Sequence, residues 1–204
     1  MLVTKVEPLT KTKYRIELEQ KQVFVLYKGE LKKFGVTEGE DLPEEQYEKI
    51  RTEVLLKRVK LRAMHLLTDM ARTESGLREK LKQGMYPEDL IDAAIAYVRS
   101  FGYLDDYRYA EQFIESKKRN KSKKEICALL LQKGVSTEEI DLAMENCWQE
   151  EDTETTIRTL IRKKGVDIST ASDQEIQRLY GFLGRKGFRF EDIRQVIQNY
   201  NENA

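Results

Sequence analysis

The side chains best suited to nucleophilic or metal chemistry in this sequence are two cysteines, Cys127 and Cys147, and a single histidine, His65. The cysteines form no Cys-x-x-Cys motif, and one histidine cannot supply a two-histidine zinc site. Phosphate loops of the Gly-x-Gly or Gly-Lys-Ser/Thr type do not occur. We therefore expect no catalytic residue, no cofactor and no metal site, and we predict that the protein is not an enzyme.

The same three side chains fit structural roles. Both cysteines occupy positions that are apolar in the other copies of the repeat described below, which indicates buried structural thiols. His65 stands among apolar residues of a predicted helix, as structural or solvent-facing histidines do. Acidic residues gather in first helical turns or on exposed faces, and none has a context that indicates a shifted pKa.

Clusters of cations are the stronger chemical signal. Residues 117–124 hold only bases among their charged residues, at the junction of two predicted helices where the backbone can present several cations together. Similar groups recur near the ends of later helices, and Arg189 extends the last of them. Such cations can meet phosphates or an acidic protein groove. The candidate basic surface comprises Lys117, Lys118, Arg119, Lys121, Lys123, Lys124, Arg158, Arg162, Lys163, Lys164, Arg185 and Lys186.

Charge is segregated along the chain although its formal sum is +0. A further basic group is spread over Lys57, Arg58, Lys60, Arg62, Arg72, Arg78, Lys80 and Lys82. Residues 136–154, by contrast, hold eight acids and no base. Any single group also fits an ordinary solvated helix face, whereas we interpret the 117–124 run as functional.

The composition indicates a helical protein without a membrane segment. Of the 204 residues, 35% are charged, and Gly and Pro are few, which favours helix. No apolar run approaches the roughly 20 residues that span a bilayer, and the N-terminus has no signal-peptide core. We expect a soluble cytoplasmic protein without a disulfide framework.

A threefold repeat organises most of the chain. Its anchors are Gly84, Gly134 and Gly187, which are 50 and 53 residues apart. Each stands where a helix should stop, so we predict left-handed backbone at all three. An acid lies four residues beyond each glycine, followed by apolar residues at helical spacing that form one buried stripe per repeat.

Each repeat is predicted to contain three helices. Ser122, Ser136 and Ser172 each begin a capping box, Thr73 is a simpler cap, and Asp105 or Asp106 caps another helix. The predicted helices lie near 58–71, 74–83, 87–101, 105–118, 122–133, 136–148, 152–164, 173–186 and 190–201.

The N-terminal region differs from the repeats. Alternating residues between 13 and 28 predict a β-hairpin connected by residues 19–22, with Leu31–Phe34 as a candidate third strand. Beyond Pro43 the pattern favours one long helix to about Ala71, or two helices with a joint near Lys57.

We therefore predict an all-α protein with three tandem three-helix repeats in an elongated curved array and a small N-terminal β-hairpin extension. The expected divisions are 1–42 for the extension, 43–103 for the long helix and first repeat, 104–149 for the second repeat and 150–204 for the third.

Several segments resemble the RecX family. Residues 99–110, Arg-Ser-Phe-Gly-Tyr-Leu-Asp-Asp-Tyr-Arg-Tyr-Ala, are similar to its Gly-aromatic-Leu-Asp-Asp signature and the Arg-aromatic-Ala helix that follows. Residues 77–84 are similar to its Leu-Arg-x-Lys-Leu-x-x-x-Gly element, and residues 126–134 to its second-repeat Lys-Gly element. The resemblance runs from about residue 43 to the end, and the N-terminal hairpin is similar to an extension found in some members.

The resemblance implies a regulatory function in homologous recombination, DNA repair and the SOS response. RecX proteins bind RecA, particularly its filament on single-stranded DNA, lodge in the filament groove, and lower strand exchange, ATP hydrolysis and co-protease activity. Some members bind DNA directly, and no catalytic residues belong to the family. The expected partners are thus RecA and the RecA filament, with direct DNA contact and no membrane, and we expect a monomer.

Two alternatives stay open. The chain could be a direct DNA-binding protein, in which case charge reversal at Lys121, Lys123 and Lys124 should abolish binding, and added salt should weaken it steeply. It could instead be a helical-repeat scaffold for another protein, which the sequence does not separate from the RecA hypothesis.

Overall fold

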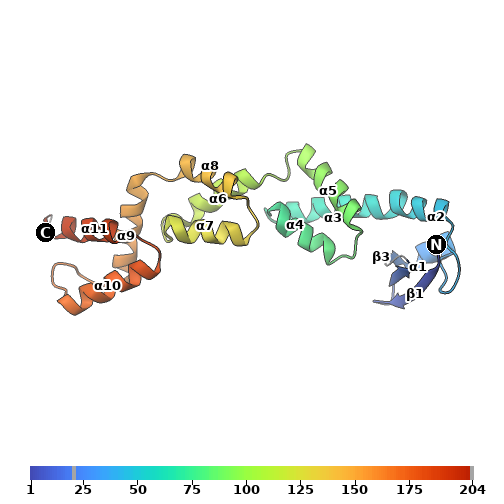
Figure 1. The fold of residues 1–204 in the computed structure, drawn as a ribbon, viewed down its shortest axis with the longest axis horizontal. Coiled ribbons are helices and arrows are strands. Elements are labelled where there is room, and N and C mark those ends of the chain that lie inside the picture. Colours follow the sequence, from blue (N-terminus) through green and yellow to red (C-terminus); the bar gives the residue numbers. More distant parts are fainter. Residues whose placement is uncertain (20–21, 203–204) are drawn as a thin grey trace. The chain divides into compact units, whose positions relative to one another are not determined.

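The structure is a computed structural model that describes residues 1–19 and 22–202. Gln20 and Lys21, in the predicted hairpin connection, lie outside the described residues. The chain forms two compact units, Met1–Asp105 and Asp106–Ala204 (Figure 1). The described helices include none that is both long and apolar enough to cross a membrane. The predicted curved array and four-part division stay predictions.

The first unit begins with a three-stranded antiparallel sheet in the order β1-β2-β3. Strands β2 (Lys13–Leu18) and β3 (Val23–Tyr27) confirm the predicted hairpin, and β1 (Val3–Pro8) adds a strand that the pattern did not reveal. Ile16, Leu18, Phe24 and Leu26 are fully buried, so one face of the sheet packs into the core.

The candidate strand at Leu31–Phe34 is wrong, because these residues belong to helix α1 (Lys28–Phe34). The Glu30 carboxylate accepts a hydrogen bond of 2.7 Å from the Tyr27 amide and so caps the first turn. Gly35, with φ of 59°, ends the helix. Lys28, Gly29 and Glu30 therefore form the first turn of a helix.

The long helical region is continuous from Glu44 to Asp69. Helix α2 (Glu44–Lys49) leads through the π-helical segment η1 (Ile50–Leu55) into α3 (Leu56–Asp69), with helical backbone angles at each junction. The joint thus precedes the expected Lys57, and it widens the helix by an i→i+5 turn without breaking it.

Helices α4 (Glu74–Lys82) and α5 (Glu88–Ser100) complete the first unit. The Thr73 hydroxyl caps α4, as predicted, by accepting a hydrogen bond of 3.1 Å from the Gly76 amide. One apolar core joins the sheet, the long helix, α4 and α5; within it the rings of Phe24 and Tyr47 lie 5.9 Å apart. The N-terminal extension and first repeat therefore fold as one body.

The second unit contains six helices in the part of the chain that the structure describes. They are α6 (Asp106–Lys117), α7 (Lys123–Gln132), α8 (Thr137–Cys147), α9 (Glu150–Lys164), α10 (Asp173–Arg185) and α11 (Phe190–Glu202). Two separate apolar clusters form their cores, one within α6–α8 and one within α9–α11. The ends of all nine repeat helices fall within about two residues of the predicted positions.

The anchoring glycines are not equivalent. Gly134 (φ 82°) and Gly187 (φ 91°) have the predicted left-handed backbone, but Gly84 does not, and Met85 takes that conformation with φ of 56°. A Cβ on Gly84 would lie 2.7 Å from Cε2 of Tyr86. Gly84 therefore serves the close approach of an aromatic ring, which the repeat alignment could not distinguish from helix termination.

The predicted capping boxes also differ. Ser136 and Ser172 form complete boxes with Glu139 and Glu175. Ser122 caps α7 through the Glu125 amide, but the reciprocal half is wrong, because the Glu125 carboxylate pairs with Lys121. The Asp105 or Asp106 cap stays a prediction.

Ser122 makes a second hydrogen bond besides its cap. Replacing it with alanine should therefore lower the free energy of unfolding more than the same change at Ser136. The buried Ser122 hydroxyl also donates a hydrogen bond of 2.5 Å to the Lys186 carbonyl, whereas Ser136 is an exposed cap. Ser136→Ala should lower the free energy of unfolding by about 1 kcal/mol. Ser122→Ala should cost about 1–2 kcal/mol more, because the partly buried Lys186 carbonyl loses its donor.

Urea unfolding followed by the fluorescence of the single tryptophan, Trp148, measures both losses in the second unit. Equal losses for the two variants would show that the Ser122–Lys186 bond adds nothing to the contact between α7 and α10.

Candidate functional site

Members of three predicted basic groups of the second unit meet at one turn, residues 119–122 between α6 and α7. Lys163, near the end of α9, donates to the Asn120 side chain, and the Lys186 carbonyl, after α10, accepts from Ser122. The turn between α6 and α7, the end of α9 and the residue after α10 are far apart in the sequence but thus meet at one place. We name this place the basic junction, comprising Lys118, Arg119, Lys121, Lys123, Lys124, Lys163, Lys186 and Arg189.

Lys118 is mainly a structural member of the basic junction. Its side chain is only 20% exposed, and its ammonium lies 2.9 Å from Glu115 and 3.4 Å from Asp152 and donates to the Cys147 carbonyl at 3.1 Å. The hydrogen bond to Glu115, with the charge of Asp152, raises the pKa of Lys118. Lys118 therefore holds α6 against the α8–α9 connection and is poorly placed to meet a partner.

Other predicted cations are also engaged within the chain. Lys121 pairs with Glu125, and the Lys186 ammonium lies 3.9 Å from the same carboxylate. Arg158 pairs with Glu154, which raises the pKa of its guanidinium, and lies 4.6 Å from the centre of the Tyr200 ring. Lys117 and Lys164 lie over the rings of Phe113 and Phe182. These cations contribute to packing as well as to surface charge.

The remaining predicted cations are exposed. Among the described residues, no ion pair involves Arg119, Lys123, Lys124, Arg162 or Arg185, and the same holds for Arg189. These six side chains can meet an external anion without breaking an ion pair among the described residues, so they are the strongest part of the candidate surface.

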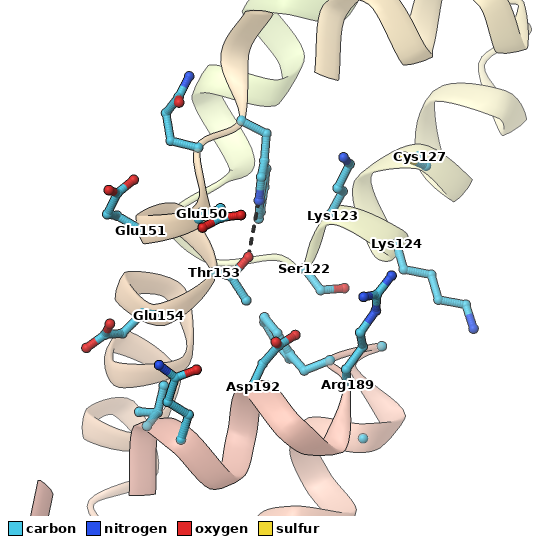
Figure 2. Close-up of a pocket in the computed structure, with 17 residues that line it drawn as sticks. Ser122, Lys123, Lys124, Cys127, Glu150, Glu151, Thr153, Glu154, Arg189 and Asp192 are labelled. Atoms are coloured by element: carbon cyan, nitrogen blue, oxygen red, sulfur yellow. Dashed lines mark hydrogen bonds between the residues drawn. The ribbon is translucent and has the colours of Figure 1, made fainter. Parts of the chain in front are cut away.

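A cleft of about 1030 Å³ adjoins the basic junction. Lys123 and Lys124 line it from the start of α7, and Arg189 from the turn before α11. Glu150, Glu151 and Glu154 lie on the α9 side, across the opening from the lysines, and Asp192 joins Arg189 on the α11 side (Figure 2). The cleft therefore carries lysines on its α7 side, glutamates on its α9 side, and one residue of each charge on its α11 side.

Sequence reasoning found the cations of this cleft but not its opposing wall. The acid-rich stretch 136–154 was visible, yet nothing in the pattern placed its last glutamates opposite α7. The lining also includes Phe188 and Trp148, whose indole N–H donates to Thr153 at 3.2 Å. The intervening helices bring these residues together, and no short motif marks them.

The two cysteines of the second unit are not activated thiols. Burial raises the pKa of the Cys127 thiol, which lines the cleft, and also that of Cys147, so neither is activated. Both cysteines pack against the α6–α8 core, but they are partly rather than fully buried as predicted, because they sit at its edge. Within residues 1–19 and 22–202, no group of His, Cys, Asp and Glu could hold a metal ion.

The fold and the cleft define a helical protein with a charged cleft, built from tandem three-helix domains. Three family models match in order: the first three-helix domain of RecX at residues 60–97, the second at 105–144 and the third at 150–197. The chain belongs to the RecX family.

Curated relatives and solved structures agree with this family assignment. The chain is 29% identical to a regulatory protein RecX from Caldanaerobacter subterraneus, over 97% of this chain and 98% of the relative. It is 31% identical to one from Trichlorobacter lovleyi, over 68% and 92%. A crystal structure of regulatory protein RecX superposes with a TM-score of 0.62 at 25% identity, covering 96% and 98%. RecX from Lactobacillus salivarius, at 22% identity and a TM-score of 0.60, covers 72% and 96% and supports the fold.

The engagement of Lys118 predicts a pH-dependent contribution to stability. Lys118→Met should lower the free energy of unfolding by about 1–2 kcal/mol near neutral pH, because Asp152 and Glu115 lose their ammonium partner. The folded pKa lies above the ordinary 10.5, so this contribution is complete below about pH 10 and disappears as the pH rises through the folded value.

Urea unfolding of both proteins from pH 8 to pH 11.5 measures the difference between them. A constant difference across this range would contradict the assignment of Lys118 to a charged contact.

Proposed function

We propose that this chain binds RecA and its filament on single-stranded DNA, and that it inhibits or modulates recombinase, ATPase and co-protease activity by occupying the filament groove. Its membership of the RecX family carries the proposal, since the three matched domains follow one another in the family's order. The resemblance of residues 77–134 to the family's sequence elements points the same way.

The chemistry of the surface supports inhibition by binding. The described cleft offers cations, carboxylates and raised thiol pKa values, which suit recognition rather than bond breaking. A protein that lies along a filament needs only to exclude other ligands or to favour one filament state over another. We therefore assign the function to occupancy, with no catalytic step.

Within the candidate surface we assign partner contact to the exposed cations of the basic junction. Lys123 and Lys124 stand in the first turn of α7, and Arg189 lies near them in the cleft. The carboxylates of Glu150 and Glu151 on the opposite wall would select a partner whose charges alternate in the same way. A protein surface offers both signs of charge, whereas a nucleic-acid backbone offers only one.

Direct DNA binding by the basic junction is the second candidate, supported by the exposed cations that form no ion pair among the described residues. It differs in its salt response, because released counterions make affinity for DNA fall linearly with the logarithm of salt concentration. We also propose that the protein acts as a monomer in the cytoplasm.

The proposal predicts that stoichiometric amounts of this protein slow ATP hydrolysis by the cognate RecA on single-stranded DNA. Lys123→Glu combined with Lys124→Glu should raise the concentration needed for half-inhibition at least tenfold, about 1.4 kcal/mol or more, because two attractive contacts become repulsive. A coupled ATPase assay measures this, with binding to the filament followed in parallel by sedimentation.

The matched control is Lys11→Glu combined with Lys32→Glu, which changes the net charge equally at exposed sites of the first unit. It should inhibit like the unaltered protein. Normal ATP hydrolysis together with no sedimentation of the unaltered protein would exclude RecA as the partner. Equal losses in the two double variants would exclude the basic junction as the contact.

A further inference from the structure

A second cleft, of about 810 Å³, lies in the first unit between the N-terminal sheet, α3 and the end of α4. Lys13, at the start of β2, and Tyr27, at the end of β3, form one wall. Lys80 in α4 and Tyr86 after it form another. The sheet and the first three-helix domain share one core, so the walls are held by the same folded body.

One face of α3 forms the floor of this cleft. Arg58, Leu61, Arg62, His65 and Asp69 recur at spacings of three and four, which places them on the same side of a helix. Arg58 and Arg62 are one turn apart, about 6 Å along the axis at 1.5 Å per residue. The floor thus presents cations in a row.

The charge of the cleft is strongly positive. Its lining holds five lysines and arginines, Lys13, Arg58, Arg62, Arg72 and Lys80, against the single carboxylate of Asp69. Arg58 is compensated by Glu30. Arg62 and Lys80 are exposed, and among the residues described here neither forms an ion pair with a carboxylate. Positive charge is therefore left available to a ligand.

Flat and apolar groups alternate with these cations. Tyr27 is 37% exposed, and its ring carries the Arg58 guanidinium at 4.6 Å from the centroid. Leu61 is 57% exposed on the floor. The Tyr86 ring is held against Gly84, where a Cβ would lie 2.7 Å from Cε2. The glycine thus allows an aromatic ring to occupy the cleft wall.

We propose that this cleft binds a single-stranded nucleic acid, with Lys13, Arg62 and Lys80 on its phosphates and a base against Tyr86 and Leu61. Cations interleaved with aromatic and apolar surfaces are the recognition chemistry of single strands, whose bases are free to stack. A duplex keeps its bases inside and cannot reach Tyr86 in this way. An acidic protein segment would use the cations but would gain little from the flat surfaces.

In this proposal the N-terminal sheet has a role in binding, because it supplies the wall of the cleft that carries Lys13 and Tyr27. It does not depend on the proposed action on RecA. It concerns the chain alone with DNA, whereas the ATPase assay concerns the chain with RecA, so either can fail without the other.

Fluorescence anisotropy with a labelled oligo-dT strand tests the proposal on the full chain without RecA. Arg62→Glu combined with Lys80→Glu should weaken binding at least tenfold. The slope of log affinity against log salt should also fall by roughly 1.4, about 0.7 for each lost phosphate contact on a single strand. The control Lys11→Glu with Lys32→Glu has the same net charge and should bind within twofold of the unaltered protein.

Gly84→Ala tests the aromatic wall without changing charge. The added methyl displaces Tyr86, so affinity should fall about threefold or more while the salt slope is unchanged. The control is Gly29→Ala, since a Cβ there meets nothing within 4 Å, and it should bind normally. Circular dichroism melting verifies that each variant is folded. A variant that unfolds is replaced by Tyr86→Leu, for which the same loss is expected.

Ultraviolet cross-linking of a halogenated oligo-dT strand locates the site. Adducts on the peptide that contains Tyr86 are expected. Adducts confined to residues 106–202, or equal affinity of the Arg62/Lys80 variant and its control, would overturn the proposal. Displacement of the strand by polyglutamate as effectively as by unlabelled oligo-dT would also overturn it, in favour of an acidic protein segment.

Discussion

Each three-helix domain of the second unit must bury a narrow apolar stripe, and this constraint shapes the rest of that unit. The α6–α8 core is made of small and medium side chains such as Ala110, Ile114 and Leu130, and the α9–α11 core is separate from it. Since the apolar side chains are used within each domain, the contact between domains is polar. Ser122 and the buried Thr156, which donates to the Lys118 carbonyl, make that contact.

A polar contact between domains has two consequences for charge. Some cations become part of the structure, as Lys118 does beside Glu115 and Asp152. It also leaves an open cleft beside the junction, where Lys123 and Lys124 remain exposed on the side of the opening that lies across from α9 and its glutamates. Within one basic run, some cations therefore pair with a carboxylate of the chain and serve the structure, whereas their neighbours stay exposed.

The three-helix domain of the first unit buries its apolar stripe in a different way. Its three-helix domain extends its core onto the N-terminal sheet, so that Phe24 and Leu26 are buried with residues of the long helix. The Arg58 guanidinium donates to the Val25 carbonyl at 2.9 Å and so links α3 to the sheet. The shared core fixes the sheet beside α3 and shapes a cleft whose cations come from both.

The sequence by itself determined the nine helices of the repeats, their order and the family, because apolar spacing, caps and glycines act through local backbone energetics. Gly134 and Gly187, Ser136 and Ser172, and the helix bounds all behave as local rules require. The tertiary structure alone decided which cations are engaged, why Gly84 is a glycine, and which acids line the same cleft as Lys123. Those properties depend on contacts between residues far apart in the chain, such as Lys163 with Asn120 and Ser122 with Lys186, which no local pattern encodes.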